Sequence, residues 1–307
     1  MNTIFTQNNK PFKALTNAKT SGLGYSLSTI FSILSSFVFI VVMLAFGLNK
    51  EGFETSDWYL YISYLLPQIS FALLAFLLIK SGNMTVGEMT TKPKARYFIL
   101  AIVLQIGLLS LSELNAWFLE LLKVVGYESD AINVPSLDGM GYFGVLFVIA
   151  VMPAFFEELF FRGILLKGLK GFGEVFAVLV CGALFSLYHK NPAQTVYQFA
   201  CGMAFALVAI RSGSILPTVL SHFLNNAWII TMTKFEWTID AIYLPFLIVS
   251  ILCLIASLVY LFFFDKRTEE KQTLGTDKKE KKDFFLFASV GIGICGLTWF
   301  LNLLSGI

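Results

Sequence analysis

Long apolar stretches separated by short polar segments recur along the whole chain. A stretch of about 20 apolar residues is long enough to cross a bilayer as a helix. The pattern therefore predicts an all-α fold, a polytopic transmembrane bundle of about eight or nine spans, the fifth of them short. The nine predicted spans are 25–47, 58–79, 97–119, 142–166, 175–190, 192–210, 214–233, 241–264 and 284–304.

The composition agrees with this pattern and excludes other classes of protein. Of 307 residues, 57% are hydrophobic and only 14% are charged, about half the charged fraction that a soluble domain carries. A net charge of +2 gives no indication of nucleic-acid binding. The four cysteines all lie inside apolar stretches, which is typical of buried hydrophobic side chains rather than of disulfides or a metal site. They are Cys181, Cys201, Cys253 and Cys295.

Basic residues lie mainly in alternate loops. One set of loops holds Lys50, Lys123, Lys190 and Lys234, and every other Lys or Arg except Arg162 falls on the side of the N-terminus. The positive-inside rule then predicts a cytoplasmic N-terminus in a multi-pass protein of the plasma membrane. Residues 1–23 have no apolar run, so we expect the first span to act as an uncleaved signal anchor.

Three regions are predicted. Residues 1–140 comprise a cytoplasmic tail and three flanking spans, residues 141–233 form a central core, and residues 234–307 add two C-terminal spans. These last two are joined by a charged loop, 265–283, which we interpret as a solvated cytoplasmic linker near the anionic headgroups of membrane lipid. The ionisable residues within spans cluster in the central core, so any chemistry is expected there.

The fourth predicted span carries two carboxylates and a guanidinium. Glu158 and Arg162 are separated by four residues and share one helix face, whereas Glu157 is rotated by about 100° and has no partner nearby in sequence. An unpaired carboxylate in a low-dielectric setting suits a general base. Pro153 cannot donate a backbone hydrogen bond, so it is predicted to kink the span and free a carbonyl near this site.

The two histidines of the chain both fall in the central core. Phe185 lies one turn before His189 and is expected to pack against its ring. Asn226 lies one turn after His222, so both side chains could direct donors to a common point, as in an oxyanion hole. Counted at about 1.5 Å per residue, Glu157 and His222 lie at matching depths, but His189 is deeper and requires a tilted or displaced helix.

A structural interpretation competes with the catalytic one, because polar side chains also join helices within membranes. We interpret the amides within the spans, Gln68, Gln105, Gln194 and Gln198, in this way. Gly202 and Ala206 are separated by four residues and predict a close approach between two helices. For the clustered Glu, Arg and His residues, the catalytic interpretation is favoured.

Three ordered elements carry a resemblance to a known family: Glu157-Glu158-x-x-x-Arg162, Phe185-x-x-x-His189 and His222-x-x-x-Asn226. In order and spacing they resemble the signature of the CPBP (Abi) family. That family includes the type II CAAX prenyl proteases and bacterial relatives linked to bacteriocin maturation, bacteriocin self-immunity and lysostaphin resistance. The likeness covers roughly residues 140–232, and the flanking spans carry none.

The resemblance implies an intramembrane endopeptidase that opens toward the cytoplasm and cleaves a peptide or protein with a segment at that face. By this likeness Glu157 activates water, His189 holds that water, and His222 and Asn226 stabilise the oxyanion. Glu158, Arg162 and Phe185 are supporting residues.

The resemblance leaves the role of metal open. Family naming often says metalloprotease, and Glu157, His189 and His222 would make a plausible zinc ligand set. In a metal-free mechanism no cofactor is required and Glu157 deprotonates water directly. We favour the metal-free version, because Asn226 is a better hydrogen-bond donor than a metal ligand.

Two further hypotheses stay open at this stage. A non-enzymatic membrane scaffold or bacteriocin-immunity protein would use the same polar core to bind a partner. A proton-coupled transporter using Glu157 and Glu158 is less favoured, because the sequence shows no repeated half. The substrate, and whether it is prenylated, is not readable from apolar spans.

Overall fold

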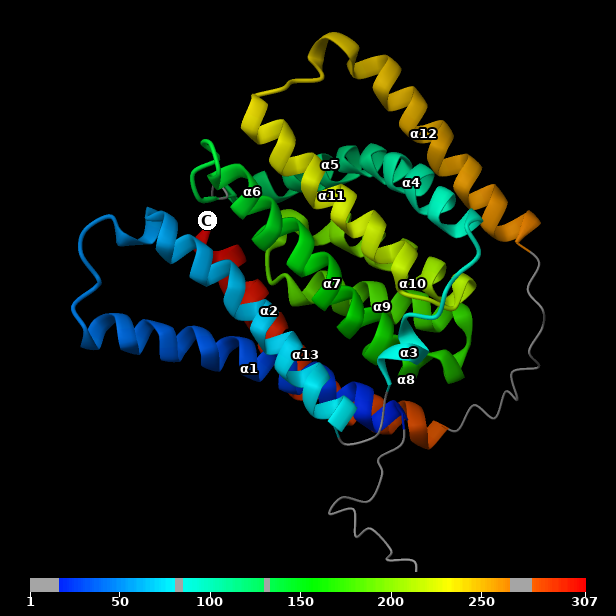
Figure 1. Ribbon diagram of the computed structural model, residues 1–307, viewed down its shortest axis with the longest axis horizontal. Helices are drawn as coiled ribbons and strands as arrows, with labels where there is room; N and C mark the ends of the chain where they lie inside the picture. Colours follow the sequence, from blue (N-terminus) through cyan, green and yellow to red (C-terminus); the bar gives the residue numbers. More distant parts are fainter. Residues whose placement is uncertain (1–16, 81–84, 130–132, 266–277) are drawn as a thin grey trace, which may run out of the picture.

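The computed structural model describes residues 17–80, 85–129, 133–265 and 278–307 (Figure 1). Within these ranges the protein is entirely helical and has no strand, so the all-α prediction is confirmed. The longer helices begin and end as follows: α1 Asn17–Ala45, α2 Asp57–Lys80, α4 Arg96–Leu108, α5 Ser112–Lys123, α9 Glu174–Tyr188, α10 Thr195–Ser212, α11 Leu216–Phe235, α12 Tyr243–Val259 and α13 Lys278–Ser305. The shorter helices are α3 Val86–Met89, α6 Gly141–Val145, α7 Met152–Glu158 and α8 Leu166–Leu169.

Seven helical segments in the described part of the chain are long and apolar enough to cross a membrane. They make this a multi-pass membrane protein, with large apolar side chains exposed along α1, α12 and α13 where lipid would cover them. The segments are Asn17–Ala45, Asp57–Leu78, Arg96–Lys123, Gly141–Phe172, Pro192–Ser212, Asp240–Phe264 and Lys278–Ser305.

The other two predicted spans correspond to α9 and α11. Helix α9 has 15 residues, which fits the short fifth span of the prediction. Helix α11 has 20 residues, but His222, Asn225 and Asn226 lower its apolarity. Both helices carry candidate site residues, and both pack inside the bundle beside α10 (Figure 1).

The first helix begins earlier than the hydropathy pattern predicts, at Asn17 rather than near residue 25. Its first turns contain the small residues Ser21, Gly22 and Gly24, which are buried although they are not strongly apolar. Gly22 allows α1 to pack tightly on α13, where Ser26 Oγ donates to the carbonyl of Phe287. Ser21 and Gly24 instead face the fourth span, and Ser21 Oγ donates to the carbonyl of Ile164. Close packing of small residues is a common way to join helices in membranes.

The fourth span is not a uniform α-helix. Helix α7 is flanked by two π-helical segments, Leu146–Val151 and Leu159–Leu165, in which the backbone hydrogen bonds reach one residue further than in an α-helix. Pro153, at the start of α7, has no N–H to donate to the carbonyl one turn earlier. The predicted interruption at Pro153 therefore takes the form of a local change in helix type.

Aromatic side chains form the core beside the fourth span. Phe71 of α2 packs against Phe160 and Phe161, with ring centroids 5.0 and 5.9 Å apart, and against Tyr188 at the end of α9. These rings are almost fully buried. The cysteines are free, and three of the four are buried, as predicted for hydrophobic side chains. Helix α12 lies apart from this core and packs on α4 (Figure 1).

Ion pairs gather at the end of the bundle where the fourth span finishes. Arg211 binds Glu174 with two hydrogen bonds, of 2.7 and 2.9 Å, and Lys167 binds Glu88. Arg96 binds Asp265 at 2.8 Å, close to the end of η8 (Tyr260–Phe264). Of the predicted loop 265–283, residues 266–277 lie outside the described residues, and α13 already begins at Lys278.

The α1–α13 contact predicts a difference between two glycines of α13. A Cβ on Gly291 would lie 2.8 Å from a ring carbon of Tyr25 and 2.9 Å from Ser26 Cα, whereas a Cβ on Gly293 would meet nothing within 4 Å. Gly291→Ala should therefore lower the free energy of unfolding by about 1–3 kcal/mol through overpacking.

Thermal unfolding in detergent measures this difference. Gly293→Ala is the matched control, because it makes the same change in the same helix and should be neutral or stabilising by up to about 1 kcal/mol. Equal unfolding midpoints for the two variants would contradict the packing described here.

Candidate active site

A fully buried ion pair joins Glu158 and Arg162 across one turn of the fourth span. Arg162 Nη1 donates to Glu158 Oε1 at 2.6 Å, and neither side chain has exposed surface. The sequence predicted this pair from its spacing. An ionised carboxylate inside a membrane bundle needs such a partner, because its desolvation is otherwise costly.

Glu158 also connects the fourth span to α11. His222 Nδ1 lies 2.9 Å from the same Oε1 atom of Glu158. A carboxylate that binds an arginine can only accept hydrogen bonds, so Nδ1 of His222 carries a proton and donates it. This contact fixes the ring, and it turns Nε2 of His222 toward Glu157.

Arg162 is held by a backbone carbonyl and aromatic rings in addition to Glu158. Its Nη2 donates to the carbonyl of Gly202 at 3.3 Å, and its guanidinium lies 4.4 Å from the ring centre of Phe185 and 5.2 Å from that of Phe205. Helices α9 and α10 pack closely at Gly202, because a Cβ on this residue would lie 2.8 Å from Gly182 Cα. The predicted close approach at Gly202 is thus confirmed, and it positions an acceptor for Arg162.

His189 lies at the C-terminal end of α9, with its ring against Phe185. The two ring centroids are 4.8 Å apart, as the sequence predicted, and His189 Nδ1 lies 2.8 Å from the carbonyl of Phe185. Because a carbonyl only accepts, Nδ1 carries a proton, and neutral His189 keeps a lone pair on Nε2.

The two imidazoles share the Phe185 ring. Its centroid lies 4.8 Å from that of His189 and 6.0 Å from that of His222. The depth mismatch counted from sequence therefore does not separate the two histidines. Glu157 and His222 are both close enough to His189 to interact with it electrostatically.

Glu157 lies opposite His222, with a side chain that is 14% exposed. Its Oε2 is 4.0 Å from His222 Nε2, too far for a direct hydrogen bond but within reach of one bridging molecule. Its Oε1 accepts a hydrogen bond of 3.2 Å from Gln68 Nε2 of α2. Glu157 thus has a partner from a flanking span, whereas Oε2 has no hydrogen bond to any of the described residues.

Asn226 is oriented by the backbone carbonyl of Ile149, four residues before Pro153. Asn226 Nδ2 donates to the carbonyl of Ile149 at 2.9 Å, and its Oδ1 accepts from Asn225 Nδ2 at 3.1 Å. Because a carbonyl requires a donor, these contacts determine which end of the amide faces Ile149. One N–H of Asn226 remains for another acceptor.

The residues present do not form a metal-binding cluster. Among the described residues, no three His, Cys, Asp or Glu side chains are grouped so that they could hold a metal ion. Glu157, His189 and His222 therefore do not provide the three-ligand set that zinc hydrolases use. No step below is assigned to a metal.

Several contributors could not be identified from the sequence as members of this site. Gln68 was interpreted only as an interhelical hydrogen-bonder, which is correct, but its partner is 89 positions away. Gln105 binds Asn225 in the same manner at 2.9 Å. Phe205 is one of 32 phenylalanines and carries no distinguishing signal. The carbonyl of Ile149 was foreseen only as one that Pro153 would free.

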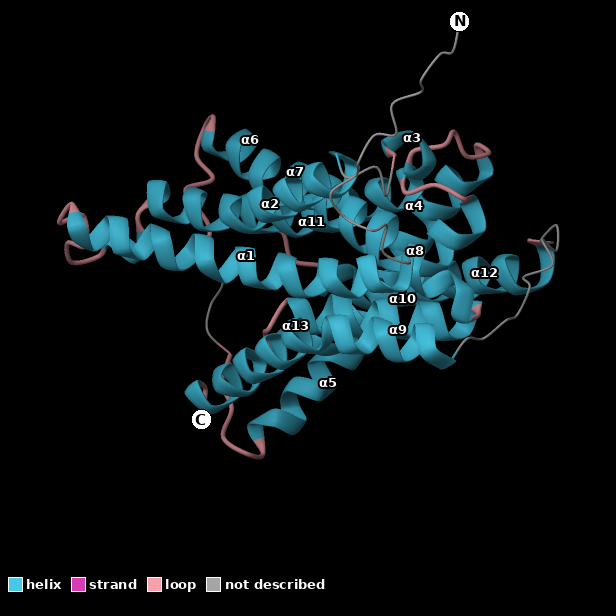
Figure 2. Cartoon of the chain, turned by 90° about the horizontal axis from the view of Figure 1, so that it is seen from below, coloured by secondary structure: helices cyan, strands magenta, loops and turns pink. Residues whose placement is uncertain are grey.

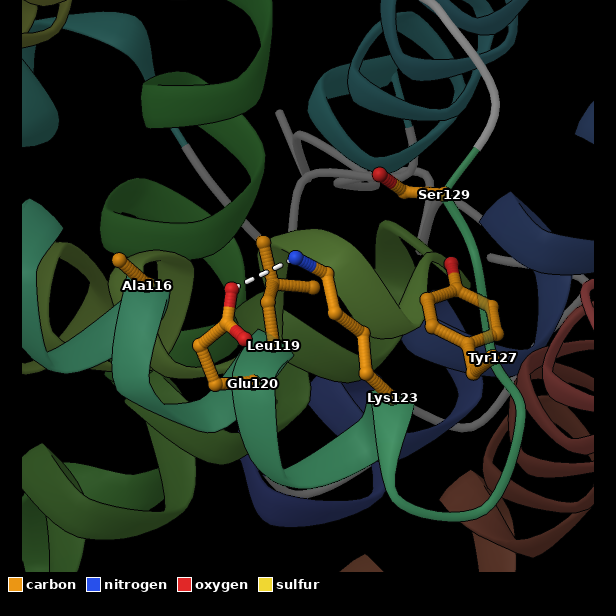
Figure 3. A pocket seen from close by; sticks show the side chains of 6 residues that line it. All are labelled: Ala116, Leu119, Glu120, Lys123, Tyr127 and Ser129. Atoms are coloured by element: carbon orange, nitrogen blue, oxygen red, sulfur yellow. Dashed lines mark hydrogen bonds and ion pairs between the residues drawn. The ribbon is translucent and has the colours of Figure 1, made fainter.

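A separate pocket of about 190 Å³ lies near the end of α5 and contains none of these residues (Figure 3). Lys123 reaches back to Glu120 there at 2.6 Å, across an exposed surface. The residues that line this pocket do not include the buried carboxylates, and we assign no function to the pocket. Figure 2 shows α5 projecting from the bundle near the C-terminal end of α13.

Comparison with known proteins bears on the segment that holds the site. Residues 140–228 match the family model described as type II CAAX prenyl endopeptidase, Rce1-like. The match covers less than a third of the chain. It includes all the candidate residues from Glu157 to Asn226, whereas Gln68 lies outside it. No curated protein and no solved structure matches the chain. The division at 140 and 233 into flanking and core regions stays a prediction.

The buried ion pair of the Rce1-like segment predicts strongly non-additive effects on stability. Arg162→Met should lower the free energy of unfolding by about 3–5 kcal/mol, because it leaves Glu158 charged and buried without its main partner. The double variant Glu158→Gln with Arg162→Met removes both charges and should recover much of this loss.

Chemical or thermal unfolding of both variants in detergent provides the measurement. An additive double variant, less stable than Arg162→Met alone, would show that Glu158 is not held by Arg162 as described.

Proposed function

We propose that this protein is an intramembrane endopeptidase that hydrolyses a peptide bond with a water molecule activated by Glu157. The observation that carries the proposal is the gap of 4.0 Å between Glu157 Oε2 and His222 Nε2. The Glu157 carboxylate and the His222 imidazole face each other there without a direct hydrogen bond. Gln68 holds Glu157 through its other oxygen, and Glu158 holds His222 through its other nitrogen. The Rce1-like family match supports a protease over other uses of such a gap.

The first step is proton transfer from water to Glu157. The water donates one hydrogen to Glu157 Oε2 and the other to the Nε2 lone pair of His189. Glu157 takes its proton as the oxygen attacks the peptide carbonyl carbon. His189 suits this role because its Nδ1 proton is engaged by the Phe185 carbonyl, which keeps Nε2 an acceptor.

The second role is stabilisation of the oxyanion that forms on the carbonyl oxygen. His222 lies between two carboxylates, so it can carry protons on both ring nitrogens and donate from Nε2. Asn226 supplies the second donor from its remaining N–H, oriented by the Ile149 carbonyl. Two preorganised donors of this kind form an oxyanion hole.

Collapse of the tetrahedral intermediate completes the reaction. The carbon–nitrogen bond breaks, and the proton held by Glu157 passes to the leaving amine, which regenerates the carboxylate. Glu158 and Arg162 do not react. Arg162 holds Glu158, and Glu158 holds the His222 ring, so both act as positioning residues.

The substrate we propose is a peptide or protein segment presented at the membrane. A peptide bond within a helix is shielded by its own backbone hydrogen bonds, so the cleaved segment is unwound or terminal. The predicted topology assigns its entry to the cytoplasmic face of a plasma membrane. The description of the matched family contains "CAAX prenyl endopeptidase". We therefore propose a lipid-modified terminal segment as the first substrate class to test.

Glu157→Gln should abolish cleavage while leaving insertion and unfolding midpoint unchanged, because the amide keeps the shape but cannot accept the proton. The measurement is cleavage of a quenched peptide library, including prenylated C-terminal peptides, by the purified protein in detergent. Glu120→Gln is the matched control, since it makes the same chemical change on exposed α5.

The same assay with a zinc chelator separates the two mechanisms. Activity that survives chelation and is lost in Glu157→Gln supports the proposal. Activity lost to the chelator and restored by zinc would contradict the metal-free version. If Glu157→Gln retains the cellular phenotype and no peptide is cleaved, a scaffold or immunity role replaces the enzymatic one.

Asn226→Ala should lower kcat by about 10²- to 10³-fold with little change in KM, because an oxyanion donor acts mainly in the transition state. Steady-state kinetics on a cleaved peptide provides the test. Gln105→Leu is the comparison, since it removes an amide that contacts Asn225 but not the proposed reaction centre. An unchanged kcat for Asn226→Ala would remove Asn226 from the oxyanion hole.

A further inference from the structure

A chain of hydrogen bonds connects Asn226 to two other helices. Asn225 Nδ2 donates to Asn226 Oδ1 at 3.1 Å. Asn225 Oδ1 in turn accepts from Gln105 Nε2 of α4 at 2.9 Å and from the Tyr197 hydroxyl of α10 at 2.7 Å. At the other end, Asn226 Nδ2 donates to the backbone carbonyl of Ile149. The fourth span, α4, α10 and α11 therefore meet in one hydrogen-bonded network.

The backbone carbonyl sets the direction of every hydrogen bond in this network. A carbonyl oxygen only accepts, so Asn226 must present its NH₂ group to Ile149 and its Oδ1 to Asn225. Asn225 must then donate through Nδ2, which leaves its own Oδ1 for Gln105 and Tyr197. Reversing either asparagine would bring two oxygens or two NH₂ groups together, which is costly in a buried setting.

Asn225 is separated from the reaction centre by Asn226. It is 5% exposed, and its side-chain hydrogen bonds within the described part of the chain go to Gln105, Tyr197 and Asn226. A buried side chain with these partners does not contact a substrate. Any effect of Asn225 on the reaction must therefore act through the orientation of Asn226.

Two donors hold Asn225, and they come from different helices. Gln105 lies outside the Rce1-like segment, whereas Tyr197 lies inside it. The backbone of Tyr197 is itself fixed near the start of α10, where its N–H donates to Asn115 Oδ1 of α5 at 3.1 Å. Because both donors share one acceptor oxygen, the loss of either donor leaves the other to keep Asn225 in the same orientation.

We propose that Asn225 is a positioning residue for peptide hydrolysis, which directs an N–H of Asn226 toward the oxyanion. The inference rests on the proposed function, because it takes Asn226 as an oxyanion donor. An Asn226 amide turned by 180° would present its oxygen to the oxyanion and repel it. Asn226 contacts the reacting group, and Asn225 acts only through Asn226.

Asn225→Asp should lower kcat by about 10- to 100-fold with little change in KM. The side chain keeps its size, and its oxygens still accept from Gln105 and Tyr197, but a carboxylate cannot donate to Asn226 Oδ1. Asn226 then turns its NH₂ group toward the introduced carboxylate and away from the oxyanion. Steady-state kinetics on a cleaved peptide provides the measurement, and the loss should not exceed that of Asn226→Ala.

Thr231→Val is the control for helix packing. Thr231 Oγ1 and the Tyr142 hydroxyl lie 2.9 Å apart, so this contact also joins α11 to the fourth span but does not involve the two asparagines. The substitution keeps the shape of the side chain and should leave kcat unchanged. Equal losses of kcat in Thr231→Val and Asn225→Asp would overturn the proposal, because packing rather than amide orientation would then set the rate.

A second test leaves both asparagines in place. Gln105→Leu or Tyr197→Phe alone should lower kcat by no more than about twofold, because the remaining donor keeps Asn225 oriented. The double variant allows Asn225 to turn and should lower kcat by about tenfold or more, which exceeds the product of the single effects. A double variant that shows only this product would overturn the proposal.

The results separate a failure of this inference from a failure of the proposed function. If the parent cleaves peptide and Asn226→Ala is slow, but Asn225→Asp keeps the parental kcat, only the inference is overturned. If the parent cleaves no peptide, or if Glu157→Gln remains active, the proposed function fails and the inference fails with it. Unfolding midpoints show whether each variant is folded, and if Asn225→Asp is not, the double variant decides.

Discussion

The buried charge of Glu158 is the constraint on which the candidate site depends. A carboxylate with no exposed surface inside an apolar bundle is tolerated only with partners that offset its desolvation, and Arg162 and His222 supply them through one oxygen. Those partners come from the fourth span and from α11, so satisfying one charge fixes the position of two helices. The tautomer of His222 and the direction of its free nitrogen follow from the same contact.

The hydrogen-bond partners of the two histidines determine whether each imidazole accepts or donates a hydrogen bond. His189 donates from Nδ1 to a backbone carbonyl, which leaves Nε2 to accept a hydrogen bond from water. His222 lies between two carboxylates, which suits donation to a developing negative charge. Phe185 packs against both imidazole rings and against the guanidinium of Arg162. A single aromatic side chain therefore contacts all three groups.

Local spacing allowed much of this site to be predicted. The Glu158–Arg162 pair and the Phe185–His189 contact each involve residues within one helical turn, so periodicity is sufficient. Contacts between distant spans were not accessible, because an apolar stretch does not encode which helix it faces. The early start of α1 was missed for a related reason: its small residues are buried by close packing, which hydropathy does not register.

The two π-helical segments of the fourth span affect how related chains can be compared. Each π turn contains about one residue more than an α turn, so the side chains beyond it are displaced around the axis by about 100°. A relative lacking one residue within Leu146–Val151 would keep a span of adequate length but direct its carboxylates to another face. Aligning such chains requires single-residue gaps inside a transmembrane helix, at the two places where this backbone departs from α geometry.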